Sequence, residues 1–139
     1  FLASPLDRSH TPKLLALAAW HGFLPMGKSS KGGVVLLKLH HRRCLLEPGK
    51  VHVGRKSRKR APRFRLSVDE AFSHVVAAVR EHTFTERPGD NWLSPDLAEM
   101  YAMVVQLPSA VRKGVAFHSV ELWERESGRL VAGEIGYTV

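Results

Sequence analysis

The alternation of apolar and polar positions is most regular in residues 115–139. Two apolar runs rich in β-branched and aromatic residues flank a charged turn, 124–129, that contains Ser127 and Gly128. This pattern predicts an antiparallel hairpin. Because Val139 lies inside an apolar run with no turn after it, we expect the sequence to be a piece of a longer protein, cut within its central sheet. Alternation divides the first strand into two faces, with Phe117, Ser119, Glu121 and Trp123 on one and Ala116, His118, Val120 and Leu122 on the other.

Apolar residues at helical spacing predict two helices before this hairpin. The first begins with Thr11 as N-cap, followed by a proline, and ends at Gly22. The second begins with Ser67 and Glu70, which have the spacing of a capping box, and runs to His82. Both start signals are local, because each depends on residues within one helical turn.

A loop, Thr83–Asn91, is predicted to end the second helix and to deliver Trp92. Ser94 as N-cap and Pro95 at the first helical position then start a third helix, which halts at Pro108. An aromatic residue between a loop and a helix start can line a pocket or can fasten the loop to the domain. Both interpretations of Trp92 are open at this point.

Short apolar runs predict strands in the first half of the chain. Val34–Leu39 is predicted to be a buried strand with Arg43–Leu46 as its antiparallel neighbour, and Gly22–Gly27 is predicted to be a turn. Val51–Val53 and Phe64–Leu66 are two further candidate strands. The resulting order is a small α+β unit, a basic run, two helices and a hairpin, which predicts an α+β fold.

Positive charge is concentrated in residues 50–65. This stretch holds eight Lys and Arg residues and no acid, which equals the whole net charge of +8. Such a block indicates a polyanionic partner, most often nucleic acid or an anionic surface. No aromatic residue interrupts the run before Phe64, which favours contact with a nucleic-acid backbone over base stacking. A nuclear localisation signal and a solvated loop are the alternatives.

Composition excludes several classes of protein. An apolar content of 44% is typical of globular proteins, and no apolar run approaches the roughly 20 residues of a membrane span. Residues 1–10 lack the basic and apolar regions of a signal peptide. The single cysteine, Cys44, is predicted to be a core residue of a protein in a reducing compartment. As a nucleophile it would need a base, which His40 or His41 could supply.

Two residues of the hairpin carry candidate chemistry. His118 shares a face with apolar residues, which favours a buried, hydrogen-bonded histidine over a catalytic base. Glu134 is a carboxylate in an apolar strand, where the outward position of an alternating strand is favoured over a cavity carboxylate that attracts an amine. Histidine pairs at helical metal-ligand spacing, phosphate-binding glycine loops and a Gly-x-Ser-x-Gly elbow are missing from the sequence, so metal or nucleotide binding is not expected.

Four short stretches together resemble motifs of one enzyme family. They are Gly22–Pro25, similar to Gly-Ile-Phe-Pro; Val51–Lys59, similar to Leu-His-Ile-Ser-Arg-Ser-x-Lys-Arg; Asn91–Pro95 leading to Tyr101, similar to Thr-Trp-Ile-Thr leading to Tyr; and His118–Trp123 followed by Leu130–Gly133, similar to His-Ser-Ile/Val-Glu-Val/Ala-Trp and Leu-Val-Gly-Gly. In this order they resemble the leucyl/phenylalanyl-tRNA–protein transferase family.

The resemblance implies an enzyme that moves Leu, Phe or a related residue from aminoacyl-tRNA to the N-terminal Arg or Lys of a protein, which marks that protein for degradation. It implies a small N-terminal α+β domain, 1–42, and an incomplete acetyltransferase-like (GNAT-like) domain, 43–139, with a mixed, largely antiparallel sheet. We expect a cytoplasmic monomer with no membrane contact. No cofactor is expected, because the ester of the aminoacyl-tRNA is already activated.

The resemblance also implies residue roles. Catalytic residues are expected beyond Val139, so the fragment alone should be inactive. Two departures concern the pocket, because Met26 and Ala19 stand where the family has Trp and Tyr. A third is Glu134 in place of an apolar residue, which could change the aminoacyl preference or accept a cationic N-terminus. The implied tRNA-binding residues are Arg55, Lys56, Arg58 and Lys59, and the implied substrate-pocket residues are Met26, Trp92, Tyr101 and Glu134.

Two rival functions are compatible with the sequence. The first is an N-acyltransferase of the same fold that uses acyl-CoA, which would need a Gln/Arg-x-x-Gly-x-Gly/Ala loop after Val139 to hold the pyrophosphate. The second is a non-catalytic RNA-binding module. Such a module should bind charged and uncharged tRNA alike, and replacing Trp92 should leave that binding unchanged.

Overall fold

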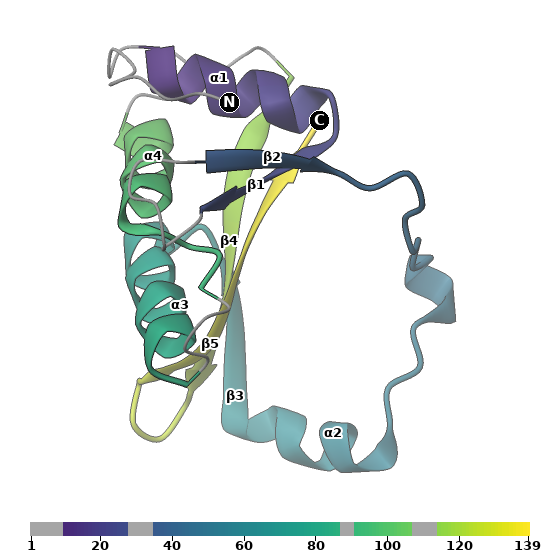
Figure 1. Cartoon of the computed structure of the whole chain (residues 1–139). Coiled ribbons are helices and arrows are strands. Elements are labelled where there is room, and N and C mark those ends of the chain that lie inside the picture. The colour runs from purple at the N-terminus through teal and green to yellow at the C-terminus, as the bar shows by residue number, and fades with distance from the viewer. Residues whose placement is uncertain (1–9, 28–34, 87–90, 107–113) are drawn as a thin grey trace.

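The computed structural model describes residues 10–27, 35–86, 91–106 and 114–139 and has a mixed α+β architecture, as predicted (Figure 1). Its described strands form two antiparallel sheets, the pair β1-β2 and a three-stranded sheet in the order β3-β4-β5. In chain order the elements are α1 (Thr11–Trp20), β1 (Phe23–Gly27), β2 (Val35–Leu39), the 3-10 turn η2 (Pro48–Lys50), α2 (Arg55–Arg60), η3 (Ala61–Arg63), β3 (Phe64–Val68), α3 (Phe72–Glu86), α4 (Pro95–Gln106), β4 (Ala116–Glu124) and β5 (Leu130–Thr138).

The predicted C-terminal hairpin is confirmed as β4 and β5. The two strands pair antiparallel with Val120 opposite Glu134, and Gly128 supplies a φ of 66° in the turn between them. Such a left-handed conformation favours glycine, because a Cβ atom would clash with the backbone. The candidate strand Phe64–Leu66 is also confirmed. As β3 it extends to Val68 and pairs with the other side of β4.

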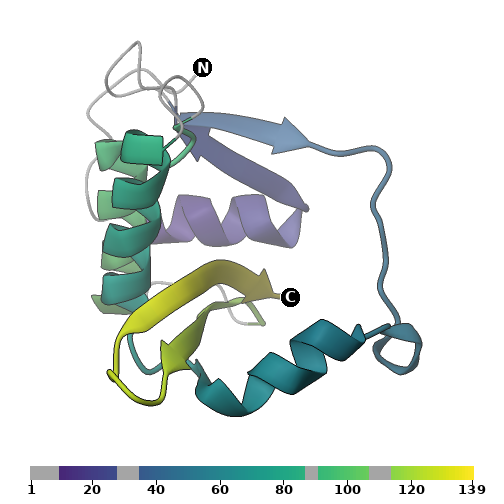
Figure 2. The same ribbon diagram turned by 90° about the horizontal axis from the view of Figure 1, so that it is seen from below.

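Helices α3 and α4 lie against one face of the three-stranded sheet, as Figures 1 and 2 both show. We call this the covered face. A Cβ atom on Gly133 of β5 would lie 2.7 Å from Cγ1 of Val75 in α3, so the helix approaches the strand closely. We call the other face the open face. Its residues, which are exposed or half-buried, are Leu66, Val68, Ala116, His118, Val120, Leu122, Ala132, Glu134, Gly136 and Thr138.

The hydrophobic core lies between the helices and the covered face. It joins residues of α1, α3, α4 and the segment before α4, namely Leu15, Phe72, Val76, Leu93, Leu97, Tyr101 and Val104. Two of the predicted helices therefore pack against each other through their apolar faces. The predicted N-cap of α4 is confirmed, because the N–H of Leu97 donates to Oγ of Ser94 at 3.3 Å.

Helix α1 is confirmed with its cap shifted by one residue. Its N-cap is His10 rather than Thr11, which is already helical, and Gly22 follows the helix with a φ of 75°. Helix α3 differs more, because it runs on to Glu86 instead of ending at His82. The predicted loop from Thr83 is wrong at its start. The Thr83 hydroxyl instead donates to the carbonyl of Val79 at 2.9 Å, within the helix.

The strand pairing predicted near the N-terminus is wrong. β2 is a strand, but it is largely exposed and pairs with Phe23–Gly27 instead of with Arg43–Leu46. The predicted turn at Gly22–Gly27 is therefore mostly strand β1. Pro25 fits there because an edge strand tolerates a residue without an N–H group. Val34 and Pro108, which bounded two predicted elements, lie outside the described residues.

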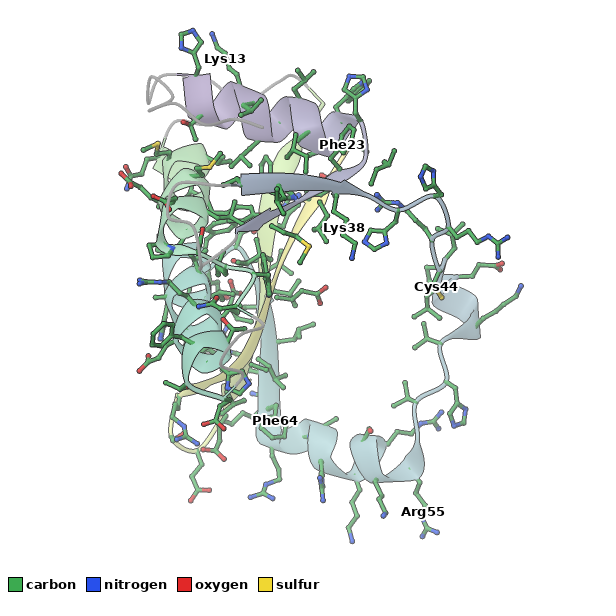
Figure 3. All side chains as sticks on the ribbon, in the orientation of Figure 1. Lys13, Phe23, Lys38, Cys44, Arg55 and Phe64 are labelled. Carbon is green, nitrogen blue, oxygen red and sulfur yellow. The ribbon has the colours of Figure 1, made fainter. Side chains whose placement is uncertain are left out.

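Residues 40–54 follow an extended path beside the body of the protein (Figures 1 and 3). They contain no strand, so the candidate strand Val51–Val53 is wrong, and almost all of them are exposed. Cys44 lies in this segment and is exposed, which corrects its prediction as a core residue. Its apolar neighbours Leu45 and Leu46 are also exposed. A run of three apolar residues is therefore too short to predict burial here.

Candidate functional site

The basic run forms a short helix, α2, at the far end of the extended segment. All six of its residues are exposed, and Figure 3 shows Arg55 pointing away from the sheet. Helix α2 has Gly54 as N-cap and no acidic residue in its first turn. Three of the four predicted tRNA-binding residues lie on one side, since Arg55, Arg58 and Lys59 have the spacing of one helical face.

The cations of α2 are not neutralised within the described residues. The described ion pairs that involve Lys or Arg join Lys50 to Glu47, with 2.9 Å between Nζ and Oε2, and Arg65 to Glu70, with 2.8 Å between Nη1 and Oε2. Neither pair includes a residue of α2. An exposed helix of this kind presents a positive surface that an anionic partner can contact without displacing an internal carboxylate.

Two predicted pocket residues, Met26 and Trp92, lie on segments that are joined by a backbone hydrogen bond. The N–H of Gly27, next to Met26, donates to the carbonyl of Trp92 at 2.6 Å. A Cβ atom on Gly27 would lie 2.2 Å from Oγ of Ser94, so only glycine allows this contact. Both Met26 and Trp92 are half-buried, and Trp92 packs against the core. The end of β1 and the start of α4 therefore share one corner of the molecule.

Tyr101 lies deeper, on α4, with 4% of its surface exposed. Its ring meets Phe117 of β4 edge-on, with 6.1 Å between the centroids. Burial, with a smaller contribution from Tyr137, raises the pKa of Tyr101 to about 12. The phenol is therefore neutral at physiological pH. Tyr101 and Trp92 belong to the same core, so these two predicted residues are brought together.

Glu134 lies on the other side of the sheet. It is exposed on the open face, opposite Val120, whereas its neighbour Gly133 lies against α3 on the covered face. Consecutive residues of a strand alternate between faces, which accounts for the difference. The described residues therefore do not place Glu134 beside Met26, Trp92 or Tyr101.

The covered face contains a buried carboxylate that sequence reasoning did not single out. Glu121 of β4 has no exposed surface. Its Oε2 accepts a hydrogen bond from the Ser67 hydroxyl at 2.6 Å, and its Oε1 accepts from the Ser119 hydroxyl at 2.5 Å and from the N–H of Ala71 at 3.2 Å. The indole of Trp123 donates to Oγ of Ser67 at 2.8 Å. The signal in the sequence was a charged residue on the same strand face as Phe117 and Trp123.

Hydrogen bonding keeps this carboxylate ionised. Desolvation raises the pKa of Glu121, but hydrogen bonds from Ser119, Ser67 and the N–H groups of Ala71 and Glu70 outweigh it, so the pKa lies below its ordinary value. Residues 70 and 71 directly precede α3, so Glu121 satisfies donors at the start of that helix. Ser67, predicted to cap α3 locally, instead lies in β3 and donates to Glu121. The predicted capping box is therefore wrong.

A second polar cluster lies on the open side of the same sheet. Nδ1 of His118 lies 2.8 Å from Oδ2 of Asp69, and Nε2 lies 3.1 Å from Oγ1 of Thr138. Chiefly the hydrogen bond with His118, helped by one from the N–H of Ser119, lowers the pKa of Asp69 despite some desolvation. His118 is hydrogen-bonded, as predicted, but its side chain is 32% exposed, so the predicted burial is wrong.

Two hollows border the helices, and both have mainly apolar walls. One, of about 310 Å³, is lined by residues that include Asp69, Phe72, Val104, Val115 and Phe117. The other, of about 430 Å³, lies between α3 and β5, with Val75, Val79, His82, Leu130 and Gly133 among its lining residues. Apolar walls with a few polar groups are typical of sites for small organic groups.

The described residues were compared with the requirements of a metal site and of a membrane-spanning helix. Among them, no group of three or more His, Cys, Asp or Glu side chains is arranged to hold a metal ion. In the part of the chain that the structure describes, no helix combines the length and the apolar character needed to cross a membrane.

These features define an α+β protein with an exposed cationic helix beside a helix-covered antiparallel sheet. The family model for leucyl/phenylalanyl-tRNA protein transferase matches residues 45–139, which include α2 and both polar clusters. The chain belongs to this family.

Curated relatives agree with the family match. The chain is 35% identical over 96 residues to a leucyl/phenylalanyl-tRNA–protein transferase of Alkalilimnicola ehrlichii, covering 68% of the chain and 33% of the relative. It is 31% identical over 127 residues to the transferase of that name from Edwardsiella ictaluri, covering 90% of the chain and 46% of the relative. For Deinococcus radiodurans the identity is 36% over 94 residues, with coverages of 66% and 40%. The chain thus spans less than half the length of these relatives.

Proposed function

We propose that the protein carrying this sequence is an aminoacyltransferase that moves Leu, Phe or a related residue from aminoacyl-tRNA to the N-terminal Arg or Lys of an acceptor protein. The transferred residue marks the acceptor for degradation. The family and the names of the relatives support the reaction. The observation that carries the tRNA part is α2, a fully exposed cationic helix within the family match.

The proposed chemistry needs little from a cofactor. The ester of aminoacyl-tRNA is already activated, so the protein has to position the acceptor amine and stabilise the oxyanion of the transition state. We propose that α2 contacts tRNA phosphates through Arg55, Arg58 and Lys59, with Lys56 beside them, without reading base sequence. Met26, Trp92 and Tyr101 are proposed to contribute one wall of the aminoacyl pocket.

Further parts of the proposal concern the whole protein. We propose an acetyltransferase-like fold, for which the antiparallel sheet with helices on one face supplies part of the expected architecture. The domain boundary near Arg42 remains a prediction. We also propose a monomer that acts in the cytoplasm.

Binding at several salt concentrations tests the role of α2. Each phosphate contact that is lost should lower the slope of log K against log [salt] by about 0.7–0.9. The double variant Arg58→Gln/Lys59→Gln of the full-length protein should lose nearly two phosphate contacts. We expect the slope to fall by the amount that corresponds to these contacts. Lys38→Gln, on exposed strand β2, is the matched control and should leave the slope unchanged. An unchanged slope in the double variant would contradict a phosphate-contacting α2.

Transfer itself is tested with labelled Leu or Phe on tRNA and a peptide that begins with Arg. The full-length protein should form the labelled peptide, and Trp92→Ala should slow transfer more than it weakens tRNA binding. A protein that binds charged and uncharged tRNA alike, forms no product with any charged tRNA, and keeps its binding in Trp92→Ala would be an RNA-binding module. The observation that favours this second candidate is again α2, because phosphate contact alone does not require catalysis.

A further inference from the structure

The open face divides into a polar half and an apolar half. Where β4 begins, His118 is hydrogen-bonded to two side chains, with 2.8 Å from Nδ1 to Oδ2 of Asp69 and 3.1 Å from Nε2 to Oγ1 of Thr138. These polar groups satisfy one another and can also bond to water. Toward the end of β4 the open face instead carries apolar side chains from all three strands. We call them the apolar patch, and they are Leu66, Val68, Val120, Leu122 and Ala132.

Strand pairing makes the apolar patch continuous. Leu122 pairs with Leu66 on one side and with Ala132 on the other, and Val68 pairs with Val120. Residues that face each other across two strands have Cβ atoms roughly 4.5–5.5 Å apart, so the patch forms two adjacent rows. Leu66 and Val68 are 66% and 55% exposed. A sheet face in contact with water normally carries polar residues, so the patch indicates a surface that another element covers.

The extended segment, residues 40–54, carries a second set of exposed apolar side chains. The segment and α2 lie on the side of the sheet away from α3 and α4, as Figures 1 and 2 show. The exposed apolar residues of the segment are Leu45, Leu46, Val51 and Val53. The segment contains no strand, so its backbone gains no support from a sheet. An apolar partner would hold such a segment in place by burying these side chains.

The apolar patch and the extended segment do not cover each other. Leu66 of the patch and Leu45 of the segment, the latter 87% exposed, are both accessible in the same structure. Both surfaces lie on the same side of the sheet, away from the helices. A single partner on this side can therefore contact both.

The size of the relatives identifies a partner. The chain corresponds to 33%, 46% and 40% of the three relatives, so more than half of each relative lies outside the matched region. A polypeptide of that length has apolar surface of its own to bury. A nucleic-acid backbone does not suit the patch, which is apolar and has the carboxylate of Glu134 beside it, opposite Val120.

We infer that, in the full-length protein, the part of the polypeptide outside these 139 residues packs on the apolar patch and against the extended segment. The polar half of the open face, with His118, stays in contact with water. Because the extended segment leads into α2, the same packing fixes the cationic helix relative to the sheet. The inference rests on the family and on the exposed apolar residues, and it does not depend on the transfer reaction.

The first experiment measures side-chain accessibility in the wild-type full-length protein by hydroxyl-radical footprinting with mass spectrometry. Leu66 and Leu45 should be oxidised several-fold more slowly in the native protein than in protein unfolded in urea. Phe84 is the matched control, because it is 68% exposed and lies on α3, on the other side of the sheet. Its oxidation rate should change little on unfolding.

The alternative occupants of the patch give different results. Oxidation of Leu66 at nearly its unfolded rate would overturn the inference, because the patch would then face water. Protection that grows with protein concentration, together with the mass of a dimer, would assign the patch to a second copy and would also overturn it. Protection that appears only after tRNA is added would do the same. The labelled-peptide assay tests the proposed function separately, so the two can fail independently.

The second experiment compares the thermal midpoints of full-length Leu66→Asp and Phe84→Asp. Leu66→Asp places an unpaired charge in an apolar contact, so its midpoint should fall by about 6–12 °C. Phe84→Asp stays in water, and its midpoint should fall by no more than about 2 °C. Equal small decreases would contradict packing on the patch. If Leu66→Asp does not fold, Leu66→Ala and Phe84→Ala replace the pair, and the Leu66 variant should still show the larger decrease, about 4 °C or more.

Discussion

The ionisable residues on the two faces of strand β4 differ in their burial and in their hydrogen bonding. Glu121 on the covered face has no exposed surface and receives hydrogen bonds from two hydroxyls and the backbone. His118 on the open face is 32% exposed and has one nitrogen hydrogen-bonded to the carboxylate of Asp69 and the other to the hydroxyl of Thr138. Only three positions separate the two residues, so the environment of the face, not the position along the strand, decides their roles.

The difference in burial means that Glu121 has a structural role, whereas the His118 side chain is accessible to solvent. A buried carboxylate with a full set of donors is costly to disturb, because its two serine donors, Ser67 and Ser119, are themselves buried. An exposed imidazole can exchange its partners at little cost, since water or a ligand replaces them. We therefore expect changes at Glu121 to alter stability more than changes at His118.

The largest effect on stability is expected from Glu121→Gln. The amide offers fewer acceptor sites than the carboxylate and carries no charge, so donors from Ser67, Ser119 and Ala71 lose part of their bonding. Hydrogen bonds to charged groups contribute about 1.5–3 kcal/mol, and we expect the free energy of unfolding in urea to fall by that amount. Glu126→Gln, in the exposed turn between β4 and β5, is the control. Equal stability of the two variants would mean that the buried network contributes nothing.

A slightly smaller effect is expected where α3 touches the covered face. In Gly133→Ala the new Cβ atom would lie 2.7 Å from Cγ1 of Val75, which forces the helix or the strand to move. Overpacking of this kind costs about 1–3 kcal/mol, which the thermal midpoint would report as a clear decrease. Gly136→Ala on the open face meets nothing within 4 Å and is the matched control. Similar midpoints for both variants would contradict the close approach of α3.

Acid should weaken the fold through the same carboxylates. The pKa values of Glu121 and Asp69 are lowered from 4.5 and 3.8, so in acid the unfolded chain takes up protons before the folded one does. Stability is therefore fully present above these ordinary values and is lost as pH falls through the lower folded-state values. Unfolding measured across this acidic range should show the loss in wild type. Glu121→Gln should lose less, because its amide does not titrate.

Elements with local signals were predictable from the sequence. The cap at Ser94 and the glycine of the β4–β5 turn each lie within a few residues of the structure they determine, and both predictions are confirmed. The start of α3 shows the limit of such reasoning, because its acceptor is Glu121, 50 residues from Ala71. The partner of β2 was missed for a similar reason, since β1 reads locally as a turn.

The candidate site divides in the same way. The charge of α2 follows from composition and is predictable from the sequence, whereas the hydrogen bonds that join Asp69, His118 and Thr138 exist only because three segments meet. Asp69 was not predictable as a site residue, because neither its φ nor its contact with His118 is encoded in adjacent residues. Alternation did place His118 and Glu121 on different faces, but it could not say which face the helices cover.

The smallest effect is expected at the rim of the covered face, where burial ends. Nη1 of Arg65 contacts both carboxylate oxygens of Glu70, at 2.9 and 2.8 Å, and its guanidinium lies 5.4 Å from the centre of the Trp123 ring. The side chains of Arg65 and Glu70 are 43% and 53% exposed, so water screens the pair. Exposed ion pairs contribute about 0.2–1 kcal/mol, and exposed cation–π contacts contribute about 0.5–1 kcal/mol. We expect Arg65→Met to lower the free energy of unfolding by about 1 kcal/mol in total, and the difference should shrink in 1 M salt as screening weakens the ion pair in wild type. A loss as large as that of Glu121→Gln would show that the rim is as dry as the interior, and the contrast between buried and accessible charge in this sheet would then be wrong.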